Sequence, residues 1–136
     1  MGMPVDGRPR RELVYRDHGP GAYVHCGVLA KDRPSDDLID LCEDRYAFIW
    51  LLRGEGVYRD GDRAIPVRAG DVLQRLPGRR HSTIAGLERT WVEWFVALPP
   101  SLMRPLAAAG VLLDEPVLRP GPDRLLHCVA LLVARQ

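Results

Sequence analysis

The segment from Arg45 to His81 decides the fold class of this chain. It reads R-Y-A-F-I-W-L-L-R-G-E-G-V-Y over residues 45–58, D-G-D-R over residues 60–63 and R-A-G-D-V-L-Q-R-L-P-G-R-R-H over residues 68–81. Short apolar runs alternate there with Asp-Gly, Ala-Gly-Asp and Pro-Gly turns, a pattern typical of consecutive antiparallel strands. The segment therefore predicts a mainly β fold whose strands close into a small barrel.

Further strand signals lie on both sides of this segment. We expect strands over residues 21–30, 46–53, 57–59, 64–68, 72–76, 81–84 and 89–98. Gly54 and Gly56 indicate a bulge after the long apolar strand. Pro66 favours an edge strand, because proline has no N–H for a neighbouring strand. Residues 37–44 are expected to form a helical turn or a loop.

Composition divides the chain into three parts. We expect a flexible N-terminal arm over residues 1–20, a barrel over residues 21–99 and a helical segment over residues 100–136. In the last part, Ser101 as N-cap and Gly110 as C-cap predict one short helix, and Asp123 starts a second. The apolar character of that second helix requires a partner surface, either the barrel or another subunit.

The bulk composition excludes several classes of protein. The 136 residues carry a net charge of +1, which gives no strong electrostatic drive toward nucleic acid. The apolar runs are all shorter than the roughly 18 residues that span a bilayer. The three cysteines are widely spaced and include no C-x-x-C pair. We therefore expect a single-domain cytoplasmic protein with reduced thiols and no membrane association.

Four motifs in sequence resemble the N-terminal effector-binding domain of AraC-type transcription regulators. They are R-G-E-G-V-Y, R-A-G-D-V-L, L-P-G-x-x-H and W-F-V-A-L-P-P, and the resemblance covers roughly residues 20–135. It implies a cupin-like antiparallel barrel of the double-stranded β-helix type, followed by C-terminal helices that build a homodimer. It also implies a small-molecule effector in the barrel and an N-terminal arm that folds over its mouth.

The resemblance further implies a separate C-terminal domain that binds DNA. That domain does not follow within these residues, so we expect an excised sensor domain or a truncated gene product. Cupin enzymes hold a metal with a His-x-His pair early in the barrel, whereas residues 50–58 contain no histidine. We therefore expect a domain that binds its ligand without metal, cofactor or catalysis.

The resemblance assigns several pocket positions. Arg53 matches a strand-end arginine that hydrogen-bonds a sugar hydroxyl in the arabinose-type sensor, and Thr83 matches a pocket position with an aromatic hydroxyl residue. Leu29 replaces a small polar pocket residue, so that contact is expected to be lost. An aromatic residue on the last strand stacks on the sugar, and Trp94 is the favoured match because it preserves the distance to Pro99.

The register of W-V-E-W-F leaves two arrangements open. The favoured one places Trp94 and Val92 inside the barrel and Glu93 outside. The alternative places Trp91, Glu93 and Phe95 inside. Because strand side chains alternate with a period of two, only one arrangement holds.

Strand alternation supplies independent candidates for ligand binding. Arg53 shares a face with Ala47, Ile49 and Leu51, the face with the smaller side chains. At the end of this face, the Arg53 guanidinium is suited to donate paired hydrogen bonds to ligand hydroxyls or to a ligand carboxylate.

Two histidines and an acid complete the candidate set. His81 shares a face with Thr83, His25 lies on an early strand, and Glu93 stands between apolar neighbours. Each has a plainer explanation, such as a backbone hydrogen bond at the barrel rim or pairing with an arginine. No spacing in the sequence indicates a metal site formed by His25, Cys26, Glu93 and His81.

Three functions follow in order of preference. The first is an effector-sensing and dimerising domain that binds a small polar metabolite, sugar-like or an organic acid. The second is a small metal-dependent cupin isomerase or dioxygenase. The third is a module whose only role is oligomerisation.

Overall fold

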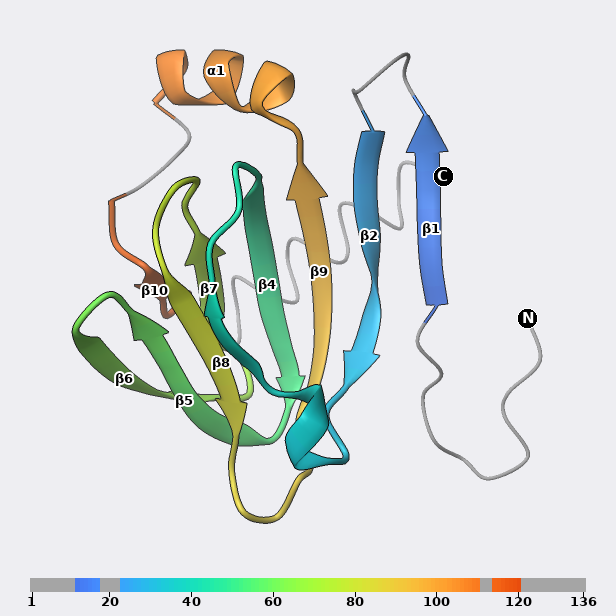
Figure 1. Cartoon of the computed structure of the whole chain (residues 1–136), viewed down its shortest axis with the longest axis vertical. Helices are drawn as coiled ribbons and strands as arrows, with labels where there is room; N and C mark the ends of the chain where they lie inside the picture. Colours follow the sequence, from blue (N-terminus) through green and yellow to red (C-terminus); the bar gives the residue numbers. More distant parts are fainter. Residues whose placement is uncertain (1–11, 18–22, 111–113, 121–136) are drawn as a thin grey trace.

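Two antiparallel sheets make up the computed structural model of this chain, which describes residues 12–17, 23–110 and 114–120 (Figure 1). The first sheet has the strand order β1 (Glu12–Asp17), β2 (Tyr23–Ala30), β9 (Val92–Leu98), β4 (Tyr46–Arg53), β7 (Val72–Arg75) and β10 (Val117–Leu118). The second has the order β3 (Leu38–Leu41), β8 (His81–Ala85), β5 (Glu55–Asp60) and β6 (Arg63–Arg68). A short 3₁₀ helix, η1 (Pro34–Asp36), precedes β3.

The chain passes repeatedly from one sheet to the other. The connections β2–β3, β4–β5, β6–β7 and β8–β9 all cross between the sheets, as expected of the double-stranded β-helix type. Among the described strands, however, no pairing joins the two sheets, so the expected barrel is not closed. The crossings are made by turns and loops, whose backbone hydrogen bonds do not continue the ladder of either sheet. The result is a sandwich that is open between its sheets.

Two glycines make the crossing from β4 to β5 sterically feasible. Gly54 has φ of +90°, and a Cβ there would lie 2.7 Å from the Trp91 nitrogen and 2.8 Å from the Thr90 carbonyl oxygen. A Cβ at Gly56 would overlap the Ile84 carbonyl oxygen. The R-G-E-G motif therefore permits a close approach between the β4–β5 crossing and the start of β9.

Several predicted strands are found with nearly the predicted bounds. The long apolar strand over residues 46–53 is β4, and β6 with Pro66 lies at an edge of the second sheet. The helical turn or loop expected over residues 37–44 is wrong for Leu38–Leu41, which forms β3, whereas residues 42–44 are irregular as expected. This strand pairs with the otherwise free edge of β8, and Ser82 Oγ accepts a hydrogen bond from the Asp40 N–H at 2.9 Å.

The hydrophobic core lies between the sheets toward the end where β4 runs into β5. Its buried members are Ile49, Leu51, Tyr58, Val67, Leu73, Ala85, Trp91 and Val117. Ile49 and Leu51 come from the face of β4 that alternation assigned to the interior, so that part of the prediction is confirmed. Tyr58 satisfies its buried hydroxyl by donating to the Gln74 carbonyl oxygen at 2.6 Å.

The chain after β9 forms one described α-helix, α1 (Pro100–Ala108), which lies across one end of the sandwich (Figure 1). Its N-cap is Pro99 and not Ser101, because Pro100 takes the first helical position, where a missing N–H costs nothing. Gly110 follows the C-cap residue with φ of +69°. The second helix expected from Asp123 lies outside the described residues, so multiple C-terminal helices are not observed.

The segment expected to be a flexible arm contains strand β1, which pairs along its whole length with β2. In the part of the chain that the structure describes, no helix has the length and apolar character needed to cross a bilayer.

Candidate functional site

A cavity of about 470 Å³ lies between the sheets, beside the core. Its apolar walls are Leu29, Leu38, Leu41, Ala47, Phe95 and Ala97. Its polar lining includes the side chains of His25, Glu43, Arg45, Arg75 and Glu93. The volume falls within the range of small-molecule sites, which are about 300–1,000 Å³ and combine apolar walls with a few polar groups.

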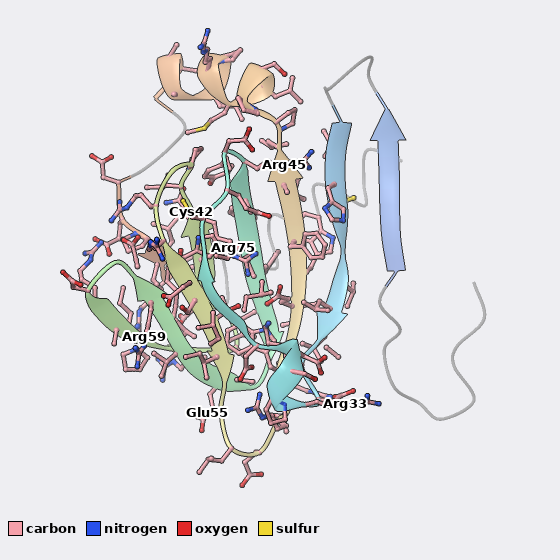
Figure 2. The ribbon with its side chains drawn as sticks, in the orientation of Figure 1. Arg33, Cys42, Arg45, Glu55, Arg59 and Arg75 are labelled. Atoms are coloured by element: carbon pink, nitrogen blue, oxygen red, sulfur yellow. The ribbon has the colours of Figure 1, made fainter. Side chains whose placement is uncertain are left out.

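Register explains why these side chains meet. Ala47 on β4 pairs with Ala97 on β9 and with Arg75 on β7, so all three point to the same side of the first sheet. The opposite wall comes from η1, β3 and the loop that follows β3. Figure 2 shows Arg75 near the middle of the molecule, between the sheets, and Arg45 toward the end of the sandwich that carries α1.

Arg75 is the most unusual group in this cavity. Its side chain is only 8% exposed, yet no carboxylate lies within ion-pair distance of it among the described residues. Nη2 donates to Thr83 Oγ1 at 3.3 Å, while the buried Nε has no partner in the described part of the chain. Burial lowers the pKa of Arg75 and Glu93 opposes that shift, but a guanidinium stays protonated in proteins. The cavity therefore holds a buried cation that lacks an anionic partner.

Glu93 lies between the cavity and the core. It is 1% exposed, and its Oε2 accepts a hydrogen bond from Trp91 Nε1 at 2.6 Å. Trp91, two residues earlier on the same face, is fully buried in the core. The indole thus fixes one carboxylate oxygen of Glu93 at the cavity wall.

Lys31 is a second buried cation close to this group. The chain's one lysine is 0% exposed, and its Nζ donates to the Asp36 carbonyl oxygen at 2.6 Å. Burial lowers the pKa of Lys31 most, with Arg75 also lowering it, whereas Glu93 raises it. A carbonyl oxygen carries no formal charge, so the Lys31 ammonium is not neutralised by its hydrogen bond.

The favoured register of the last strand is wrong. Glu93 and Phe95 line the cavity and Trp91 is in the core, which is the alternative arrangement. Trp94 is opposite Trp50 of β4, on the side facing away from the cavity. The register follows from the pairing of Phe95 with Ile49, because Ile49 points into the core and its cross-strand partner points to the same side.

The other predicted ligand residues are distributed unevenly around the cavity. His25 lines it and contacts Phe95 edge to face, with ring centroids 5.1 Å apart. Thr83 is fully buried and holds Arg75, behind the cavity wall. Arg53 is exposed at the end of β4, beyond a register shift after Leu51, and donates to the Thr90 carbonyl oxygen at 3.2 Å, so it does not line the cavity.

His81 is buried but lies outside the cavity lining. Its ring stacks on Tyr58 with centroids 6.5 Å apart, and its Nδ1 is 3.3 Å from the Arg79 carbonyl oxygen. Burial lowers the pKa of His81 to about 4, with a further contribution from Arg75. This environment matches the plainer explanation of a histidine bonded to the backbone.

Sequence reasoning missed Arg75 and Lys31 as cavity-region residues, and it placed Phe95 inside only in the alternative register. Leu73 and Arg75 lie two residues apart and therefore share a face of β7, which could have predicted that Arg75 points inward. This signal was ambiguous because β7 is buried on both faces, which leaves Val72 and Gln74 equally suited to the interior. Within the described residues, no three His, Cys, Asp or Glu side chains come together as a metal-ligand set, and His25, Cys26, Glu93 and His81 do not converge.

Solved structures with the same fold are numerous but distant in sequence. An uncharacterised conserved protein with a double-stranded β-helix domain from Klebsiella pneumoniae is 18% identical, with a TM-score of 0.50 over 71% of this chain and 81% of that chain. A cupin 2 conserved barrel domain protein from Salinispora arenicola is 15% identical, with a TM-score of 0.50 over 80% and 96%. The cupin domain of Schizosaccharomyces pombe Cnp3 is 7% identical, with a TM-score of 0.53 over 72% and 69%. These likenesses establish a cupin-type fold.

Comparison with curated proteins gave no significant match. The family model of the AraC-like ligand binding domain matches residues 29–135, which include every side chain of the cavity lining except His25. The match covers most of the chain and agrees with the sheets and the cavity described above. This chain belongs to the family of AraC-like ligand binding domains.

Proposed function

We propose that this chain is the effector-sensing domain of an AraC-type transcriptional regulator, acting in the cytoplasm. It binds a small polar metabolite, sugar-like or an organic acid, in the cavity between its sheets and leaves that molecule chemically unchanged. The observation that carries the proposal is the cavity of about 470 Å³, lined by charged and apolar side chains, in a chain of this family.

The position of the cavity suggests how occupancy is transmitted. One wall is formed by the segment η1–β3, which is attached to β8 through a short and irregular pairing. A ligand that contacts both walls favours the arrangement in which they are close, and it shifts the population toward that arrangement. The regulator then responds through a homodimer built by helices that follow β9 and through a DNA-binding domain outside this chain.

Ligand binding is tested by calorimetry and thermal unfolding with sugars, organic acids and their neutral analogues. A ligand at a hundred times its Kd adds about 2.7 kcal/mol to the free energy of unfolding, which raises Tm by several degrees. We expect at least one chemical class to bind with one molecule per chain. If no compound of any class binds while light scattering shows a stable dimer, the oligomerisation-only module is favoured.

Turnover and metal content test the absence of catalysis. We expect the bound ligand to be recovered unchanged after prolonged incubation. Stoichiometric iron, zinc or manganese in the purified protein, together with conversion of the ligand, would favour the metal-dependent cupin enzyme.

A further inference from the structure

We infer that the effector is a small monocarboxylate with an apolar body, and that its carboxylate binds the Arg75 guanidinium inside the cavity. The inference rests on the proposed function and narrows its ligand class. It starts from the geometry of Arg75, which lines the cavity and has a buried Nε without a hydrogen-bond acceptor in the described residues. Leaving a buried charged donor unsatisfied is costly, so such groups are normally paired.

The charges around the cavity specify how much negative charge the ligand brings. Four ionisable side chains around the cavity are at least nine-tenths buried, and one of them, Asp37, is neutralised by its ion pair with Arg89 at 2.8 Å. The other three are Lys31, Arg75 and Glu93. They sum to one uncompensated positive charge. The remaining carboxylates that act on Arg75 and Lys31, those of Asp36 and Glu43, are more exposed. A single negative charge on the ligand balances the buried set.

The shape of the guanidinium favours a carboxylate over a phosphate. Arginine presents its donors in a planar fork that matches the two oxygens of a carboxylate. A phosphate monoester carries about −1.5 to −2 charges at neutral pH, more than the site has to balance. Glu93 on the same wall would repel the excess charge.

The rest of the lining describes the rest of the ligand. Leu38, Leu41 and Phe95 offer an apolar surface beyond the charged end. Glu93 has one carboxylate oxygen bonded to Trp91, which leaves the other to accept a hydroxyl or amine donor from the ligand. Aliphatic, aromatic and hydroxylated monocarboxylates all satisfy this description, whereas a neutral sugar leaves the Arg75 charge unbalanced.

The test compares each acid with its own primary amide, which has nearly the same shape and no charge. The probes are short aliphatic acids, benzoate and hydroxybenzoate, with phenyl phosphate and arabinose as further classes, measured by calorimetry on the intact chain. We expect monocarboxylates to bind at least tenfold more tightly than their amides. Equal binding of acids and amides, or tighter binding of phenyl phosphate or arabinose, overturns the inference but leaves the proposed function intact. If no probe of any class binds, the proposed function fails together with the inference.

Arg75→Met supplies a second, independent readout. The variant removes an unpaired buried cation and fills its space with an apolar chain of similar length, so the ligand-free Tm is expected to be unchanged or higher. Acid binding falls at least tenfold and the preference for acid over amide disappears. The matched control is Arg59→Met on the exposed side of β5, which should change neither the ligand-free Tm nor the affinity for the acid. A large loss of Tm in Arg75→Met without ligand would contradict an unpaired cation, and the comparison of acid with amide on the unaltered chain decides the ligand class regardless of that variant.

Discussion

At the scale of single residues, His81 is buried in a place where its protonated form is disfavoured. Its pKa in the folded protein is about 4, against 6.5 in the unfolded chain, so the unfolded state binds the proton first as pH falls. The stability that depends on neutral His81 is fully present above pH 6.5 and is lost as pH falls toward about 4. We expect about 2 kcal/mol of this loss by about pH 5.

Urea unfolding near neutral pH and near pH 5 measures this loss. Other groups also titrate in that range, so the comparison is with His81→Gln, which keeps a polar side chain that does not titrate. The unaltered chain should lose about 2 kcal/mol more stability than the variant over the same interval. Parallel losses in both proteins would show that His81 does not carry the effect.

Thr83 illustrates a residue that was predicted to contact ligand and instead contacts another cavity residue. Its hydroxyl accepts the hydrogen bond from Arg75 and is fully buried. We expect Thr83→Val to let the guanidinium reorient and to weaken monocarboxylate binding several-fold. The diagnostic readout is a smaller ratio of acid to amide affinity, because a general loss of packing would weaken both equally. Ile84→Val, at the neighbouring position facing the other way, is the control for changes in β8.

At the scale of elements, backbone chemistry explains which strands were predictable. The apolar run of β4 and the proline of β6 were informative because both depend on local sequence. The strand β3 was missed because its sequence L-I-D-L suits a helix as well as a strand, and its pairing with β8 is a contact across more than 40 residues. The side chains inside the cavity depend on strand register, which W-V-E-W-F leaves open.

The crossing from β4 to β5 provides a test of how backbone geometry holds the elements together. Gly54→Ala combines a left-handed conformation with overlap against the backbone of Thr90 and Trp91, so we expect it to cost roughly 3 kcal/mol. The matched control is Gly78→Ala, which has φ of +73° but open space around its Cβ position. It should cost only about 1–2 kcal/mol, the price of the left-handed conformation alone.

Thermal or urea unfolding of the two glycine variants separates strain from crowding. If Gly54→Ala and Gly78→Ala lose the same stability, the close approach of β9 does not contribute. The larger loss at Gly54 would confirm that the R-G-E-G motif is required by packing between the sheets.

At the scale of the whole molecule, the space between the sheets is used in two ways. Toward the β4–β5 crossing it is filled by the hydrophobic core, and toward the other end it is hollow. The same strands serve both parts. β4 contributes Ala47 to the cavity and Leu51 to the core. In the same way β9 contributes Ala97 to the cavity, and Trp91, immediately before β9, packs in the core. Small residues at paired positions, where the core has large ones, leave the room for a ligand.

This division predicts opposite outcomes for one type of substitution in the two parts. Ala97→Leu places extra methyl groups in the hollow, where they meet no packed neighbour, so Tm should stay within a few degrees while ligand binding is lost. Ala85→Leu adds the same groups to the core, where overpacking typically costs about 1–3 kcal/mol. Its cavity is untouched, so ligand affinity measured well below its Tm should be retained. Loss of stability in Ala97→Leu comparable to that in Ala85→Leu would mean that the hollow is occupied by protein atoms in solution, and the space proposed for the effector would not exist.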